Sequence, residues 1–172
     1  MRAFLKLIYF VMMFFAFFTS QAYAEKNFID AVPVAIKALD YVRSLDRGND
    51  FSIGIVYNSS DITASKNAKT LQATLKNNIK SFLVPVDALE GNTQFNVYFV
   101  VGDLETDYPE IKRISEKNHI LSLGFNAACA RAEACAICVE SESGVKIYLN
   151  EDALEEMGHD IDSTFRYLAI RL

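Results

Sequence analysis

The sequence has few of the residues on which catalytic and metal chemistry most often depends. Histidine occurs only twice in 172 residues. His119 opens an apolar stretch and His159 follows Gly158 in a polar turn, so we interpret both as structural. The motifs G-x-S-x-G and H-E-x-x-H and Walker-type sequences are also missing. We therefore expect a protein that is not an enzyme and that uses no metal and no cofactor.

Runs of basic residues and flexible linkers are missing as well. Without residues 1–24, the chain has 15 basic residues against 22 acidic ones, a net charge of −7, and no run of five or more Lys or Arg. Because neutralisation of phosphates supplies most nucleic-acid affinity, we expect no nucleic-acid partner. No repeat, low-complexity segment or long Gly/Ser/Pro-rich linker marks a boundary. The sequence therefore predicts a single domain over residues 25–172.

One long apolar run lies near the first residue. Arg2 and Lys6 precede twelve apolar or aromatic residues at 7–18, and Ala22-Tyr23-Ala24 forms a small-x-small cleavage site. A helix of twelve residues spans about 18 Å, well short of the ~30 Å hydrocarbon core of a membrane. No cysteine follows the run that could carry a lipid. We expect residues 1–24 to be a secretory signal peptide, cleaved after Ala24, that directs the protein to the periplasm.

Helical and strand patterns alternate along the rest of the chain. The order predicts an α/β fold, a Rossmann-like three-layer sandwich with a mostly parallel sheet and a C-terminal β-hairpin addition. Strands are expected at 51–57, 82–86, 97–101 and 119–123, with hairpin arms at 134–140 and 145–149. Helices are expected from Asp30, and at 61–78, 108–117, 151–157 and 164–171, with Asn150 and Ser163 as caps of the last two.

One turn has a position that suits ligand binding. Gly102-Asp103 follows the apolar stretch 97–101, at the carboxyl end of a strand, where α/β proteins often bind ligands. A Gly-Asp pair is also ordinary turn material, so the pattern alone assigns no ligand-binding residue.

Three cysteines lie within ten residues, at Cys129, Cys135 and Cys138. In an exported chain the default interpretation is a disulfide, and three cysteines leave one thiol over. A bridge between Cys135 and Cys138 is disfavoured, because three residues of a strand separate Cα atoms by about 10 Å, beyond the ~7 Å limit. A bridge between Cys129 and Cys135 would close a short loop, and one between Cys129 and Cys138 is the alternative.

Two other interpretations of the cysteines are weaker. Cys135-Ala-Ile-Cys138 matches the C-x-x-C of redox enzymes, but its flanking residues are typical of a strand rather than of a helix start. A Cys₃His zinc site would need a distant histidine and three thiols kept reduced outside the cytosol. A structural disulfide is favoured.

The second half of the chain contains several short motifs that are recognisable by their order and spacing. These are His119-Ile-Leu-Ser-Leu-Gly124, the segment from Cys129 to Cys135, Gly144-Val-Lys-Ile-Tyr-Leu-Asn150, and then Ala153, Gly158, Ser163 and Leu168-Ala169. Together they resemble the YfiR family of periplasmic proteins, and the resemblance covers about residues 96–170.

The resemblance implies a regulator rather than an enzyme. Well-known members of that family repress an inner-membrane diguanylate cyclase, and so hold down cyclic-di-GMP and biofilm formation. It also implies a homodimer and a disulfide between Cys129 and Cys135, which match a cysteine pair in some members, with Cys138 left over. We expect the partner to be the periplasmic domain of a membrane cyclase, and the disulfide-bearing segment to be a switchable element.

An alternative is a small periplasmic ligand-binding component of a transport system. The stretch FSIGIVYNSS at 51–60, followed by a helix, resembles the opening of such proteins. Those proteins normally have two lobes, and the 148 residues after the signal peptide are few for two.

Overall fold

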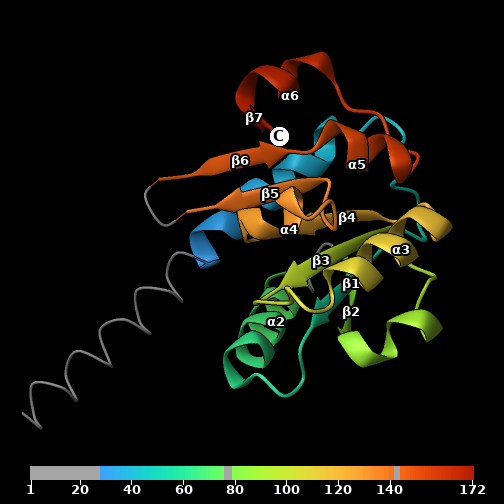
Figure 1. Ribbon diagram of the computed structural model, residues 1–172, viewed down its shortest axis with the longest axis vertical. Coiled ribbons are helices and arrows are strands. Elements are labelled where there is room, and N and C mark those ends of the chain that lie inside the picture. The colour runs from blue at the N-terminus through green and yellow to red at the C-terminus, as the bar shows by residue number, and fades with distance from the viewer. Residues whose placement is uncertain (1–27, 76–78, 142–143) are drawn as a thin grey trace, which may run out of the picture.

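The computed structural model describes residues 28–75, 79–141 and 144–172, and the expected signal peptide lies outside these ranges. A seven-stranded sheet runs through the molecule in the order β2-β1-β3-β4-β5-β6-β7 (Figure 1). Every neighbouring pair of strands is parallel except β5 and β6, which form the hairpin. The predicted α/β class, the mostly parallel sheet and the added hairpin are confirmed. The strands are β1 (Ser52–Tyr57), β2 (Lys80–Pro85), β3 (Val97–Val101), β4 (Leu121–Gly124), β5 (Ile137–Glu140), β6 (Lys146–Leu149) and β7 (Ile170–Arg171).

Helices connect the strands, and several begin or end differently from the sequence prediction. The first helix covers 28–38, so Asp30 lies inside it and does not cap it. The last helix is capped by the Asp162 side chain rather than by Ser163, and Ile170 and Arg171 form a strand. After the helix 28–38 come the 3-10 helices η1 (Leu39–Tyr41) and η2 (Val86–Gly91), and the α-helices α2 (Ile62–Leu75), α3 (Tyr108–Asn118), α4 (Ala127–Arg131), α5 (Glu151–Glu156) and α6 (Ser163–Leu168), which is the last helix.

Helices cover both faces of the sheet, which makes three layers. The central strands β1 and β3 are buried along their whole length, as expected of strands covered on both sides. Their side chains alternate between two separate apolar cores. One core joins Val97, Phe99 and Val101 to α2 and the helix 28–38, and the other joins Tyr98 and Val100 to α3 and α4. Among the described residues, the helices are all too short or too polar to cross a membrane.

Candidate functional site

A cleft of about 590 Å³ lies at the carboxyl ends of β3, β4 and β5. These three strands are mutually parallel, so the chain leaves them at the same edge of the sheet. The cleft is lined by residues at the carboxyl end of each strand or directly after it. Two residues of the helix 28–38 and one of α2 complete the lining. The lining residues with a polar or aromatic side chain are Phe28, Asn67, Asp103, Phe125, Asn126, Glu140 and Ser141.

A glycine lets the floor of the cleft form. Gly102 follows β3 directly and has a φ of +90°, a backbone conformation that side chains disfavour. A Cβ atom at this position would lie 2.7 Å from the Cβ of Ala64 on α2. Gly102 therefore allows β3 to end close against α2, and it places Asp103 in the cleft. This is the Gly102-Asp103 turn that the sequence pattern marked.

The polar groups of the cleft are acidic or neutral. Asp103 and Glu140 contribute carboxylates, Asn67 and Asn126 contribute amides, and no lining residue is a lysine or an arginine. Both carboxylates also accept hydrogen bonds from the backbone, Asp103 from Glu105 N at 3.2 Å and Glu140 from Ala127 N at 2.7 Å. Each carboxylate is therefore oriented by a hydrogen bond from a backbone N–H.

An aromatic group forms the other wall. The rings of Phe28 and Phe125 meet edge to face with their centroids 4.9 Å apart, and Phe99 lies edge to face against Phe125 at 5.8 Å. Such contacts fix ring orientation as well as burying apolar area. The cleft therefore combines rigid aromatic surface with a few polar groups, the usual composition of a small-molecule site.

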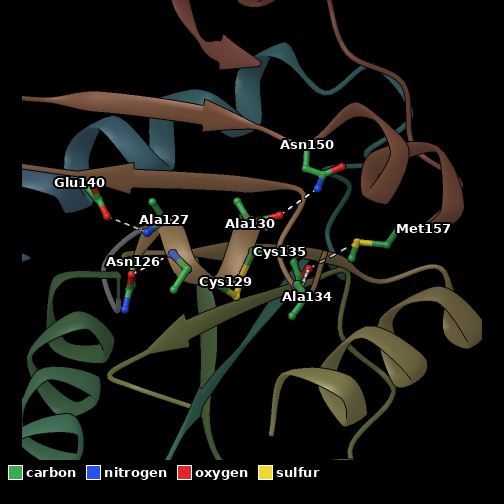
Figure 2. The surroundings of a disulfide bond; sticks show 11 residues. Asn126, Ala127, Cys129, Ala130, Ala134, Cys135, Glu140, Asn150 and Met157 are labelled. Carbon is green, nitrogen blue, oxygen red and sulfur yellow. Dashed lines mark hydrogen bonds between the residues drawn. A yellow bond between two sulfur atoms is a disulfide. The ribbon is translucent and has the colours of Figure 1, made fainter. Parts of the chain in front are cut away.

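The disulfide-bearing segment adjoins the cleft through α4. Asn126 caps α4 by accepting a hydrogen bond from Ala128 N, and Glu140 on β5 accepts one from Ala127 N (Figure 2). At its other end, α4 is connected to the start of α5, since Asn150 Nδ2 donates to Ala130 O at 2.8 Å. A displacement of α4 would therefore move Asn126 in the cleft and Asn150 at the far end.

Cys129 on α4 and Cys135 after it form a disulfide, with Cα atoms 5.3 Å apart, and Cys138 is a buried free thiol. This is the favoured pairing from the sequence. The loop that the bridge closes is also held by hydrogen bonds, because Ala134 N and Cys135 N both donate to Cys129 O and Ser122 Oγ donates to Ala134 O. Burial raises the pKa of the Cys138 thiol to about 12.

The two histidines lie near each other, away from the cleft. His119 ends α3 in the left-handed conformation, with a φ of +53°, and its ring packs against Gly158. His159 Nδ1 lies 2.9 Å from Ser44 Oγ, and burial lowers the pKa of His159. Among the described residues, the three cysteines are the one group of three or more close side chains of metal-ligating type.

Sequence reasoning missed most of the cleft. Phe28 and Asn67 come from two different helices, Asn126 carried no signal in the sequence, and Glu140 was predicted only as a hairpin residue. The one usable signal was position, since parallel strands end at a common edge. That signal identified Gly102-Asp103, but not the helical residues that face it.

No family model and no curated protein matches the chain. Solved structures that share its fold include the ABC domain in complex with L-Trp from Streptococcus pneumonia, at 13% identity and a TM-score of 0.62, covering 80% of this chain and 61% of that one. A conserved domain protein from Vibrio cholerae matches at 14% identity and a TM-score of 0.63, over 81% of this chain and 59% of that one.

A third such structure is a substrate-binding protein with adhesive properties from Clostridium difficile, in its ligand-free, open form. It matches at 14% identity and a TM-score of 0.61, over 72% of this chain and 55% of that one. The chain thus spans a little over half the length of these proteins. At such low identity the likeness concerns the fold alone.

Proposed function

We propose that the chain is a periplasmic regulatory protein that acts by binding and represses an inner-membrane diguanylate cyclase. The proposal rests on the resemblance to YfiR proteins and on one surface feature. A catalytic role is not part of it: the regulator would act by holding the cyclase's periplasmic domain in an inactive state.

The surface feature is an apolar patch on α6 and β7, formed by Tyr167, Leu168, Ile170 and Leu172. These side chains are exposed by 90%, 57%, 48% and 47%. The patch lies at the edge of the sheet, because β7 pairs with β6 alone among the described strands. Grouped apolar side chains on an exposed surface mark protein interaction sites, and an open strand edge offers unpaired backbone groups as well. We therefore assign the cyclase contact to this patch.

Co-purification tests the assignment. A tagged chain, expressed with its signal peptide, is recovered from detergent-solubilised membranes, and cellular cyclic-di-GMP is measured in the same strain. Deleting the gene should raise cyclic-di-GMP, and Ile170→Asp should release the cyclase and raise it to the same level. Ile62→Asp is the matched control, since Ile62 is 87% exposed on α2, outside the patch. Unchanged cyclic-di-GMP in the deletion strain would refute the proposal.

The second candidate function is the binding of a small solute in the cleft. It is favoured by the 590 Å³ cleft and by two solved structures of similar fold, one described as a substrate-binding protein and the other an ABC domain in complex with L-Trp. Calorimetric titration of the pure protein with free amino acids and small amines tests it. Binding that is weakened by Asp103→Asn and by Phe125→Ala would support this role, and an absence of heat across the set would count against it.

A further inference from the structure

The free thiol of Cys138 lies beside the disulfide. The Sγ atoms of Cys129, Cys135 and Cys138 all lie within 4.8 Å of one another, and the three residues are at most 1% exposed. One sulfur comes from α4, one from the loop after it and one from β5. A thiol held this close to a disulfide is in position to exchange with it, since the exchange needs only a thiolate and access to one sulfur.

We propose that this cluster is a built-in thiol–disulfide exchange site, at which Cys138 replaces Cys135 as the partner of Cys129. The Cys138 thiolate attacks the Sγ of Cys129, the bond between Cys129 and Cys135 breaks, and a bond between Cys129 and Cys138 forms. Cys135 leaves as a thiolate and takes up the proton that Cys138 has lost. The step needs no external oxidant or reductant, because one sulfur is oxidised as another is reduced.

The geometry selects Cys129 as the sulfur that is attacked. Cys135 precedes a bend at Ala136, and the chain then enters β5, where Ile137 pairs with Leu123 and with Leu149. A bridge between Cys135 and Cys138 would close a short ring that contains Ile137 itself. A bridge between Cys135 and Cys138 would therefore distort a central pairing of the sheet. Cys129 lies on a separate helix that packs against β5, so a bridge from it to Cys138 leaves the strand in place.

Gly124 provides the space for the third sulfur. A Cβ atom at position 124 would lie 2.8 Å from the Sγ of Cys135, 3.0 Å from the Sγ of Cys138 and 3.3 Å from the Cβ of Cys129. The first of these contacts is shorter than a Cβ atom can make, and the other two are tighter than most Cβ contacts. The absent side chain thus leaves a common space that borders all three cysteines.

The surroundings of Cys138 make the exchange slow and shield it from thiols and oxidants in solution. Burial raises the pKa of Cys138, and the nearby Glu140 adds to the effect, whereas hydrogen bonds from the backbone of Ala130, Gly124 and Asn126 oppose it. Tyr108 is another titratable group that interacts with Cys138. At neutral pH the thiolate is scarce, and burial keeps dissolved thiols and oxidants away. The disulfide next to it remains the accessible reaction partner.

The exchange would change which parts of the chain the disulfide connects. The bridge between Cys129 and Cys135 closes the loop after α4, whereas a bridge between Cys129 and Cys138 would fasten α4 to β5 and leave the loop with its hydrogen bonds alone. Because α4 carries Asn126 and β5 carries Glu140, the two bridges would hold this side of the cleft in two different ways. This inference is independent of which partner or solute the protein binds.

Peptide mapping tests the proposal on the wild-type mature chain. The purified protein is held between pH 7 and pH 9, unfolded in acid guanidinium, and trapped with N-ethylmaleimide before digestion with trypsin. Trypsin cuts after Lys117, Arg131 and Lys146, so Cys129 lies on one peptide and the other two cysteines lie on the next. Fragmentation of the second peptide then shows whether Cys135 or Cys138 carries the maleimide.

The expected result is a population with a bridge between Cys129 and Cys138 and the label on Cys135. Its rate of formation should rise about tenfold per pH unit, because the attacking species is the thiolate of a group with a pKa well above this range. Label that stays on Cys138 at every time and pH would overturn the proposal.

Two single variants give an independent answer. Cys135→Ser leaves Cys129 and Cys138, which should form a bridge and leave no free thiol in the folded protein. Cys129→Ser is the matched control, in which Cys135 and Cys138 should remain as two free thiols. A folded Cys135→Ser protein that keeps two thiols would overturn the exchange, and a bridge in Cys129→Ser would overturn the choice of Cys129. If either variant fails to fold, the wild-type map decides.

Discussion

Gly124 ends β4 at the point where the three cysteines converge, and replacing it is the sharpest test of that packing. Gly124→Ala should lower the free energy of unfolding by about 1–3 kcal/mol, because a methyl group must displace buried sulfur atoms that a disulfide holds in place. Urea unfolding followed by circular dichroism measures the change.

Gly91 offers the control for this substitution. Nothing lies within 4 Å of the position of a Cβ atom there, so Gly91→Ala should leave the free energy of unfolding unchanged or raise it slightly. Equal effects of the two substitutions would show that Gly124 does not make room for the sulfurs.

His159 should make the stability of the protein depend on pH. Burial lowers the pKa of His159 below its usual value of 6.5, so the unfolded chain binds a proton at a higher pH than the folded chain does. The stabilisation that comes from the neutral ring is complete above about pH 6.5 and is lost as the pH falls toward the folded-state pKa. The urea midpoint should therefore drop between pH 7.5 and pH 5.

Two histidine variants show whether this group is responsible. His159→Gln should flatten the drop, since glutamine does not titrate. His119→Asn should keep it, because asparagine tolerates the positive φ at position 119 and leaves His159 in place. A drop that survives His159→Gln unchanged would contradict the assignment.

At this scale the sequence allowed part of the site to be predicted. The bridge between Cys129 and Cys135 is present, as the resemblance implied, whereas spacing and strand geometry by themselves disfavoured only a bridge between Cys135 and Cys138. The surroundings of His159 could not be foreseen, since its contact Ser44 lies 115 residues away in the chain. The convergence of all three sulfurs on Gly124 was equally hidden, because it depends on β4 lying beside β5.

Asn150 connects two short elements, and its two hydrogen bonds can be separated. Its Oδ1 accepts from Ala153 N at the start of α5, and its Nδ2 donates to Ala130 O at the end of α4. The residue is only 7% exposed. Asn150→Asp keeps the acceptor for α5 but places a carboxylate against the Ala130 carbonyl. We expect it to lower the free energy of unfolding by about 1–3 kcal/mol, measured in urea at pH 7.

A helix cap whose side chain only accepts hydrogen bonds, and donates none to another helix, provides the comparison. Asp61 caps α2 by accepting hydrogen bonds from Thr63 N and Ala64 N, and Asp61→Ala should cost about 1 kcal/mol. Asn150→Ala should cost more than this, because it also removes a hydrogen bond to the buried Ala130 carbonyl, which then keeps the bond from Glu133 N. An Asn150→Asp protein as stable as the wild type would show that the bond to Ala130 contributes nothing.

Elements with strong periodicity could be predicted from the sequence, and those that depend on pairing could not. The stretch 97–101 was predicted as a buried strand and is β3, residue for residue, since it is apolar on both faces. Ile170 and Arg171 were predicted as helix but form β7, because pairing with Tyr148 and Leu149 outweighs their local preference. The predicted start of the hairpin arm at 134 lies three residues before β5, where the closed loop interrupts it.

For the molecule as a whole, the sheet determines both the position of the cleft and the way the two cores are coupled. The cores lie on opposite faces of the same strands, and neighbouring residues such as Tyr98 and Phe99 belong to different cores. If the helices on one face came away from the sheet, they would expose the same strands that form the core on the opposite face. The described part of the chain should therefore unfold in one cooperative step.

Two tryptophan reporters can test this cooperativity, since the natural sequence contains no tryptophan. Tyr41 packs against the core that contains Phe99, and Tyr148 belongs to the core that contains Tyr98. In Tyr41→Trp and Tyr148→Trp, fluorescence reports one face each, while circular dichroism reports the whole fold. Within each variant the two signals should give the same urea midpoint. Fluorescence that changes well before the circular dichroism in either variant would mean that one layer separates from the sheet on its own, and α4 with Cys129 would then move relative to Cys138 on β5 without unfolding the rest.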